Sequence, residues 1–195
     1  MLTPLTSLRV LCVAVVLAAG HAHKVSAQPV APSPTHAPEV VPMPSELPAW
    51  QMVVDGQNFP EGPAWDGRSS LFFSNCNGGT VMRITHGQPG AAVFASAADD
   101  PAPFGKTNGL TFGADGALYA CDYGTPSVVR LGLDGSARVL ARACDDGTAF
   151  IRPNDLAFDP QGNLYVTDSW AYKREDPQGA VYRIDAATGA VSRAR

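Results

Sequence analysis

An internal repeat of 46 to 47 residues constrains the fold of this chain more than any other feature of its sequence. Glu61, Asn108 and Asn154 recur at spacings of 47 and 46 residues, each followed by an aromatic residue four positions later and by a leucine ten positions later. Short strand patterns separated by Asp-Gly and other Gly-rich turns fill each repeat. A period in the forties filled with short strands is typical of β-propeller blades. The sequence therefore predicts an all-β fold, a β-propeller of four-stranded blades, with about three blades in this chain.

Alternating apolar residues and turn signals predict four strands in each repeat. The predicted strands cover 62–65, 71–75, 80–85 and 91–96 in the first repeat, 110–112, 118–121, 127–133 and 137–141 in the second, and 156–158, 164–167, 180–184 and a strand from 190 in the third. The aromatic residues that share one repeat position are predicted to lie in the core: Trp65, Phe112 and Phe158. Three aspartates are predicted to hold turns and strand ends by hydrogen bonds to the backbone: Asp155, Asp159 and Asp168. An insertion at 171–179 is open to two interpretations, a pocket-shaping loop and a solvated surface loop.

The N-terminal residues 1–27 have the pattern of a cleavable signal peptide. Arg9 precedes an apolar run at 10–19, and Val25-Ser26-Ala27 before Gln28 resembles a cleavage site. The apolar run is too short to span a bilayer as a helix. The sequence therefore predicts a periplasmic or secreted protein that has no membrane attachment after cleavage. Residues 28–48 contain seven prolines and are predicted to form an extended linker, so the propeller region is expected at 49–195.

Charge and cysteine content narrow the partners and the chemistry. The net charge is −4 and the sequence has no dense basic patch, which argues against nucleic acid and favours a small-molecule partner. Cys76, Cys121 and Cys144 remain after the signal peptide. An odd number permits at most one internal disulfide, and the sequence does not choose the pair. No histidine lies near them in sequence, so we expect thiols without a catalytic role.

Several short motifs, taken in their order and spacing, resemble the SMP-30/gluconolactonase/LRE family. The motifs are Glu61-Gly-Pro63, Asn108-Gly-Leu110, Arg152-Pro-Asn-Asp-Leu156 and the segment 159–168. The resemblance runs from about Phe59 to Ile184. It implies a six-bladed propeller with a divalent cation in the central channel, usually calcium, and hydrolysis of sugar lactones in many members.

The resemblance also implies roles for individual residues. Glu61 and Asn154 match metal ligands, Arg152 matches a substrate-binding arginine, and Asn108 is placed in the substrate pocket wall. Carboxylate and amide oxygens are hard ligands that suit calcium or magnesium, with other divalent metals as alternatives. A bound cation can polarise a lactone carbonyl and activate a water molecule. The catalytic residues are unknown, because the resemblance places the general base in blades beyond Arg195.

Other hydrolase chemistry is disfavoured by the sequence. No Gly-x-Ser-x-Gly motif is present, and His36 and His86 are the only histidines after residue 27, so a serine-hydrolase triad is not expected. Three blades are fewer than the roughly four to eight that close a propeller. We therefore expect the 195-residue chain to lack half of the architecture, to require the remaining blades for closure, and to show no lactonase activity alone.

Three functional interpretations stay open. The first is a secreted metal-dependent hydrolase that opens a sugar lactone or a similar ester. The second is a propeller that binds ligands or proteins without catalysis, because the fold does not fix the function. The third is an inert truncated product. The identity of the substrate is not readable from these residues.

Overall fold

The computed structural model of the chain describes residues 51–99, 104–169 and 179–194. The chain divides into two units, Met1–Pro48 and Ala49–Arg195, and every described residue belongs to the second. The predicted signal peptide, the predicted linker and almost all of the insertion at 171–179 lie outside the described residues. No helix in the described ranges is long and apolar enough to cross a membrane.

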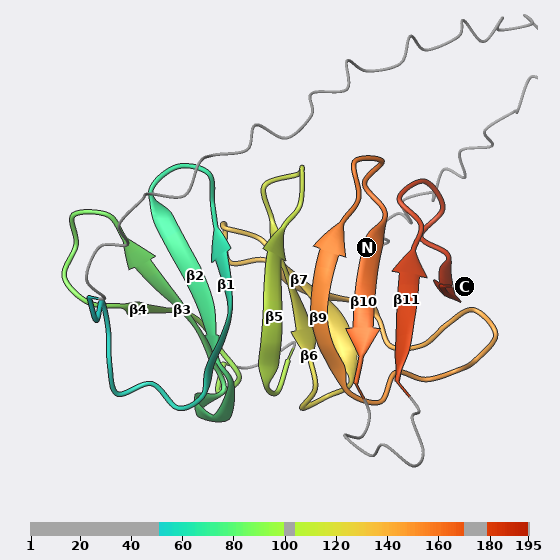
Figure 1. Cartoon of the computed structure of the whole chain (residues 1–195), viewed down its shortest axis with the longest axis horizontal. Helices are drawn as coiled ribbons and strands as arrows, with labels where there is room; N and C mark the ends of the chain where they lie inside the picture. Colours follow the sequence, from blue (N-terminus) through green and yellow to red (C-terminus); the bar gives the residue numbers. More distant parts are fainter. Residues whose placement is uncertain (1–50, 100–103, 170–178, 195) are drawn as a thin grey trace, which may run out of the picture. The chain divides into compact units, whose positions relative to one another are not determined.

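The described residues form three four-stranded antiparallel sheets in chain order (Figure 1). The strands of sheet 1 are β1 (Pro60–Trp65), β2 (Ser70–Asn75), β3 (Thr80–Thr85) and β4 (Ala92–Ser96), with a short 3-10 helix, η1 (Cys76–Gly78), after β2. Those of sheet 2 are β5 (Thr107–Phe112), β6 (Leu118–Asp122), β7 (Ser127–Leu131) and β8 (Ala137–Ala141). Those of sheet 3 are β9 (Pro153–Phe158), β10 (Leu164–Asp168), β11 (Ala180–Ile184) and β12 (Val191–Arg193). The predicted all-β fold of four-stranded blades is confirmed.

The innermost strands begin earlier than the sequence pattern predicts. β5 starts at Thr107 and β9 at Pro153, whereas the apolar pattern begins at Leu110 and Leu156. The pairing of each inner strand with its neighbour shifts register at the intervening residues. Such a bulge interrupts the alternation of apolar and polar residues, so the pattern did not reveal these strand starts.

The hydrophobic core lies between successive sheets. One cluster joins Phe72 and Val81 of sheet 1 to Leu118 and Val129 of sheet 2. A second cluster joins sheets 2 and 3, with Val128 and Cys121 on one side and Leu164, Val166 and Tyr182 on the other. Each sheet is thus stabilised by burial of apolar area against its neighbours rather than by a core of its own.

Aromatic side chains at one repeat position join neighbouring sheets. Phe112 packs edge-on against Phe72 of the preceding sheet, with ring centroids 5.4 Å apart. Phe158 packs in the same way against Tyr119, at 5.0 Å. The prediction of a core position was wrong for Trp65, which is 53% exposed. No sheet precedes sheet 1 in the described residues, so Trp65 has no equivalent partner there.

Two glycines let the innermost strands approach closely, and β1, β5 and β9 lie side by side (Figure 1). A Cβ on Gly62 would lie 2.4 Å from the carbonyl oxygen of Asn108, and one on Gly109 would lie 2.6 Å from the Cα of Asp155. Both distances are shorter than real Cβ contacts, so only glycine fits. The strand starts that carry Glu61, Asn108 and Asn154 are therefore neighbours.

Buried carboxylates fix the segments that enter two inner strands. Asp122, which is fully buried, accepts hydrogen bonds from the backbone N–H groups of Gly105 and Lys106, each at 2.8 Å. Asp168 at the equivalent position accepts from the N–H groups of Ile151 and Arg152, at 2.7 and 2.8 Å. The predicted structural role of Asp168 is confirmed by these contacts. They hold the chain in place just before β5 and β9.

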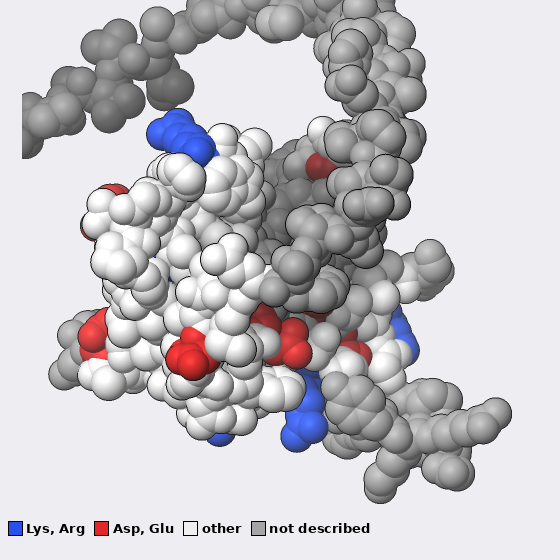
Figure 2. Space-filling model, turned by 60° about the vertical axis from the view of Figure 1, so that its left-hand side comes forward, with Lys and Arg blue, Asp and Glu red and all other residues white. Residues whose placement is uncertain are grey.

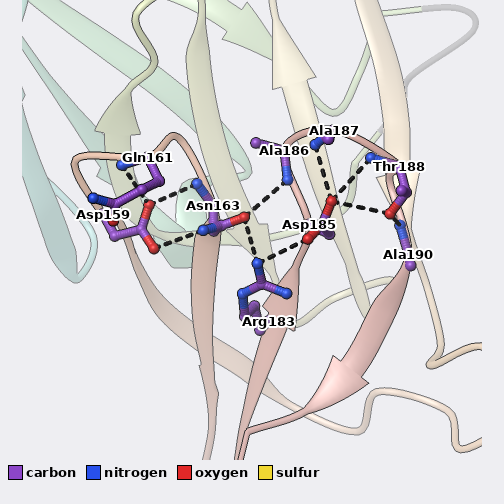
Figure 3. A network of polar contacts seen from close by, with 9 residues as sticks. All are labelled: Asp159, Gln161, Asn163, Arg183, Asp185, Ala186, Ala187, Thr188 and Ala190. Carbon is purple, nitrogen blue, oxygen red and sulfur yellow. Dashed lines mark hydrogen bonds and ion pairs between the residues drawn. The ribbon is translucent and has the colours of Figure 1, made fainter. Parts of the chain in front are cut away.

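The opposite ends of the strands are held by turn networks (Figure 3). In sheet 3, Asn163 donates from Nδ2 to Asp159 Oδ2 at 2.8 Å and accepts from Arg183 Nη2 at 2.7 Å. Arg183 also pairs with Asp185 at 2.8 Å, and Asp185 accepts from the backbone N–H groups of Ala187 and Thr188. The carboxylates at this end are thus occupied by structural contacts, as predicted for Asp159.

Candidate functional site

A polar pocket of about 290 Å³ lies where the inner strands begin. Its lining combines aromatic, amide and guanidinium groups from all three sheets and their loops: Phe59, Asn77, Asn108, Tyr123, Arg152 and Asn154. Asn108 and Asn154 are the second residues of β5 and β9, and Arg152 directly precedes β9. Three of the four predicted site residues therefore meet in one pocket.

Glu61 occupies the equivalent position in β1 but is not part of this lining. It lines a separate groove of about 500 Å³ on the outer face of sheet 1, together with Met52, Leu71, Phe73 and Ile84 among others. Among the residues that the structure describes, no sheet covers this face. Glu61 therefore lines a different cavity from Asn108, Arg152 and Asn154.

The side chains of the predicted site residues have no polar partners among the described residues. Within the described ranges, no hydrogen bond or ion pair joins the side chains of Glu61, Asn108, Arg152 or Asn154 to another group. Glu61, Asn108 and Asn154 are half-buried, and Arg152 is exposed. Buried and half-buried polar groups normally find partners, so side chains left open in this way are available to a ligand.

Sequence reasoning missed three residues of the pocket, Phe59, Asn77 and Tyr123. The Tyr123 hydroxyl donates to Asn77 Oδ1 at 3.4 Å, which links sheet 2 to the η1 segment of sheet 1. None of these residues shares an identity with its repeat equivalents, so the repeat gave no signal for them. Only their position in loops that follow or precede predicted strands could have indicated them.

Phe59 has an unusual backbone conformation at the pocket wall. Its φ is 64°, and it is the only non-glycine residue with positive φ in the described ranges. The N–H of Cys76 donates to its carbonyl oxygen at 3.1 Å, and the N–H of Asn77 donates to the carbonyl oxygen of Asn58 at 3.1 Å. Left-handed backbone is unfavourable for a bulky residue, so these two contacts hold Phe59 in place.

The pocket presents hydrogen-bond donors and one positive charge. Burial raises the pKa of Tyr123, with smaller effects from Cys76 and, in the opposite direction, from Arg152, so its phenol stays protonated at neutral pH. Arg152 is the cation of the lining, and no carboxylate belongs to it. This arrangement suits a ligand rich in hydroxyl, carbonyl or carboxylate oxygens.

The cysteines among the described residues, Cys76, Cys121 and Cys144, are buried and free. Burial, and to a lesser extent the charge of Glu61, raises the pKa of Cys76 to about 11. Burial also raises the pKa of Cys121 and that of Cys144. Thiolates are scarce at neutral pH under these conditions, which agrees with the expected absence of nucleophilic thiols.

The oxygen donors of the predicted metal ligands are of the kind that a hard divalent cation prefers, but they are too few to complete its coordination. Glu61 offers a carboxylate and Asn154 an amide oxygen, whereas calcium takes about six to eight oxygen ligands. The described residues contain no group of three or more His, Cys, Asp and Glu side chains that could hold a metal ion. They can therefore supply part of a calcium site.

Comparison with known proteins gives a consistent result. The family described as SMP-30/Gluconolactonase/LRE-like region matches residues 59–195. A gluconolactonase from Xanthomonas campestris is 26% identical, with 73% of this chain and 49% of that chain covered and a TM-score of 0.61. A putative gluconolactonase is 24% identical, with 73% and 50% covered and a TM-score of 0.59. No curated protein matches the chain in sequence.

A likeness of fold alone extends to a chain of a nidogen/laminin complex, at 18% identity, with 69% and 47% covered and a TM-score of 0.53. This chain spans about half the length of each of the solved structures named here.

Proposed function

Because the chain belongs to the SMP-30/gluconolactonase/LRE-like family, we propose that it contributes to a lactonase-type hydrolase that opens a sugar lactone or a similar ester. One observation carries this proposal. Asn108, Arg152 and Asn154 meet in one pocket, and their side chains have no polar partner among the described residues. Polar groups that are gathered but unsatisfied are suited to a polyhydroxylated ligand.

Each residue has a chemical task in this proposal. Arg152 donates charge-assisted hydrogen bonds to carbonyl or carboxylate oxygens of the ligand, and Asn108 binds its hydroxyl groups from the wall. The neutral Tyr123 hydroxyl donates its proton to Asn77 Oδ1, so its oxygen is oriented to accept a hydrogen bond from a hydroxyl group of the ligand. Glu61 and Asn154 would hold a divalent cation, with calcium preferred for these oxygen donors. When bound, such a cation polarises the carbonyl and lowers the pKa of a water molecule.

The location of the protein is part of the same proposal. Residues 1–27 direct export and are removed, and the linker at 28–48 precedes the propeller region at 49–195. A periplasmic or secreted location suits calcium, which is abundant outside the cytosol relative to its level within. The partners of the chain are then a small-molecule lactone or ester and the further blades that closure requires.

A binding experiment with D-gluconate, the acid that gluconolactone hydrolysis yields, tests the role of the pocket. Arg152→Ala is expected to weaken gluconate binding to the purified chain about tenfold, because a hydrogen bond to a charged group contributes about 1.5–3 kcal/mol. Isothermal titration calorimetry measures the affinity. Arg138→Ala, at an exposed position on β8, is the matched control and should leave binding unchanged. Equal affinity in wild type and Arg152→Ala would contradict the proposal.

Turnover of gluconolactone by the purified chain with added calcium is not expected. The pocket lining contains amides, a guanidinium and a protonated phenol, none of which serves as a general base at neutral pH. Robust hydrolysis by the purified chain would contradict this expectation.

Non-catalytic binding is the second candidate function, favoured by the lack of a base in the described pocket. Gluconate binding with no turnover after all blades are supplied would support it over the hydrolase.

A further inference from the structure

The residue that directly precedes each innermost strand is held by the same backbone contact in all three sheets. Phe59, Lys106 and Arg152 occupy this repeat position. The carbonyl oxygen of each accepts a hydrogen bond from the first N–H group after the second strand of its sheet. The donors are Cys76, Tyr123 and Ser169, at 3.1, 3.0 and 3.2 Å respectively. The three sheets therefore hold this position in the same way.

Phe59 nevertheless differs from its two equivalents in backbone conformation. Its φ is 64°, whereas neither Lys106 nor Arg152 has a positive φ. A proline follows both Phe59 and Arg152, so the proline does not impose this conformation. A bulky residue in the left-handed region costs free energy, and such residues are concentrated at ligand-binding sites. The conformation of Phe59 therefore points to a function of its side chain.

One side chain of sheet 1 accounts for the difference between the sheets. Asp122 accepts hydrogen bonds from the N–H groups of both residues before β5, and Asp168 does the same before β9. Asn75 has the equivalent position in sheet 1, and it accepts from the N–H of Asn58 at 2.7 Å but not from that of Phe59. An amide has one acceptor oxygen where a carboxylate has two, so the N–H of Phe59 is not held in this way.

Core packing does not explain the position of the Phe59 ring. The ring belongs to neither hydrophobic cluster, and among the described residues it packs on no other aromatic ring. It lines the polar pocket, as Tyr123 does. Figure 2 turns the side with sheet 1 forward and shows mainly uncharged residues there. Sheet 1 and its loops likewise contribute uncharged groups to the pocket, the Phe59 ring and the Asn77 amide.

The pocket thus combines aromatic rings with polar groups, which is the combination that a closed sugar ring requires. Such a ring presents C–H groups on its faces and hydroxyl oxygens at its edge, whereas an open-chain sugar acid has no fixed face. C–H groups carry small positive partial charges and pack on the negative face of an aromatic ring. The polar groups of the lining can then bind the hydroxyl groups.

We propose that Phe59 packs its ring on the closed ring of a sugar lactone, so that the pocket prefers the lactone to the acid that hydrolysis yields. This role rests on the proposed function, because it concerns the ligand of the same pocket. Arg152 does not make this distinction, since the lactone carbonyl and the acid carboxylate both accept hydrogen bonds from a guanidinium. Phe59 is thus the residue that determines specificity for the ring form.

The binding of two ligands, measured by isothermal titration calorimetry on the purified chain, tests this role. D-gluconolactam, in which an amide replaces the ring ester, keeps the closed ring and resists hydrolysis, whereas D-gluconate is the open-chain acid. The wild type should bind the lactam more tightly. Phe59→Leu should weaken lactam binding about fivefold more than gluconate binding, because it removes the aromatic face. Phe59→Tyr keeps that face and should restore the preference for the lactam.

Thermal unfolding separates this role from a purely structural one. Phe59→Gly should raise the midpoint of unfolding, because glycine adopts a positive φ without steric cost, and it should lose the preference for the lactam. Lys106→Gly, at the equivalent position without a positive φ, is the matched control and should lower the midpoint. A purely structural Phe59 would give a lower midpoint in Phe59→Gly and an equal loss of affinity for both ligands.

The outcomes distinguish failure of this role from failure of the proposed function. If the wild type binds gluconate, three results would overturn the role of Phe59 alone: no preference for the lactam, a preference that survives Phe59→Leu, or a lower midpoint in Phe59→Gly. Failure of the wild type to bind either ligand would overturn the proposed function and the role of Phe59 together.

Discussion

At the scale of single residues, the polar side chains of this chain separate into satisfied and open groups. Asp122 accepts hydrogen bonds from the N–H groups of Gly105, Lys106 and Gly124 and from the Thr125 hydroxyl. Asn154, which also lies near a strand end, has no side-chain partner among the described residues. The first kind stabilises loops, and the second kind is available to a ligand. Residue type alone does not tell a structural polar side chain from one that is available to a ligand. The hydrogen bonds in the structure do.

The turn aspartate Asp185 gives a prediction for the pH dependence of stability. Hydrogen bonds from the Thr188 backbone N–H, together with Arg183 and the Thr188 hydroxyl, lower its pKa to about 2. Because the folded-state pKa lies below the unfolded value of about 3.9, this contribution is complete above about pH 4 and is lost as the pH falls towards 2. Asp185→Asn should therefore be less stable than wild type at pH 7, with a difference that shrinks between pH 4 and 2.

Urea unfolding at a series of pH values measures that difference. A difference between wild type and Asp185→Asn that stays constant from pH 7 to pH 2 would show that the network of Figure 3 does not act through the charge of Asp185.

At the scale of elements, the close approach of inner strands positions the candidate site. Gly109 in β5 faces the backbone of β9 at Asp155, and Gly62 in β1 faces the backbone of β5 at Asn108. These contacts bring the starts of the three strands together. The pocket at Asn108 and Asn154 is therefore a product of strand packing as well as of loop conformation.

Replacement of Gly109 tests this packing. A Cβ at Gly109 would lie 2.6 Å from the Cα of Asp155, and backbone cannot move aside as a flexible side chain can. Gly109→Ala should lower the free energy of unfolding by about 1–3 kcal/mol, and gluconate binding should weaken with it. Chemical denaturation and calorimetry measure the two effects. The control is Gly179→Ala, whose Cβ would meet its nearest atom at an ordinary 3.5 Å; equal stability of the two variants would contradict the account.

The sequence predicted the sheets better than the strand starts. Strands such as β3, β8 and β11 were predicted with their observed bounds, because alternation and turn signals are clear there. The starts of β5 and β9 were missed because a bulge breaks the alternation. The core position of Trp65 was predicted from its repeat equivalents, but burial depends on a neighbouring sheet that the described residues do not include.

The candidate site was predictable where its residues belong to the repeat. Asn108 and Asn154 share a repeat position, and Arg152 belongs to the motif around Asn154, so the sequence grouped them and the structure places them in one pocket. Phe59, Asn77 and Tyr123 carry no repeat signal, because the backbone conformation of Phe59 and the Tyr123 contact to Asn77 are set by tertiary structure. The metal-ligand roles of Glu61 and Asn154 stay predictions.

At the scale of the whole molecule, the described sheets leave two faces uncovered. The predicted site residues line two different cavities. Glu61 lies in a groove on the open face of sheet 1, while Asn154 lies in the pocket between sheets. Both openings have one physical cause, since every blade of a propeller needs a neighbour on each side. A blade packed on the open face of sheet 1 would cover the groove that Glu61 lines.

A calcium titration of the purified chain tests most directly the proposal that Glu61 and Asn154 are oxygen ligands of a cation site. We predict calcium binding by isothermal titration calorimetry that weakens at least about tenfold in Glu61→Gln, because calcium affinity depends on the number of charged ligands. Asn154→Ala should also weaken it, whereas Asp146→Asn, in an exposed turn, should not. Calcium affinity that is the same in wild type, Glu61→Gln and Asn154→Ala would contradict the claim.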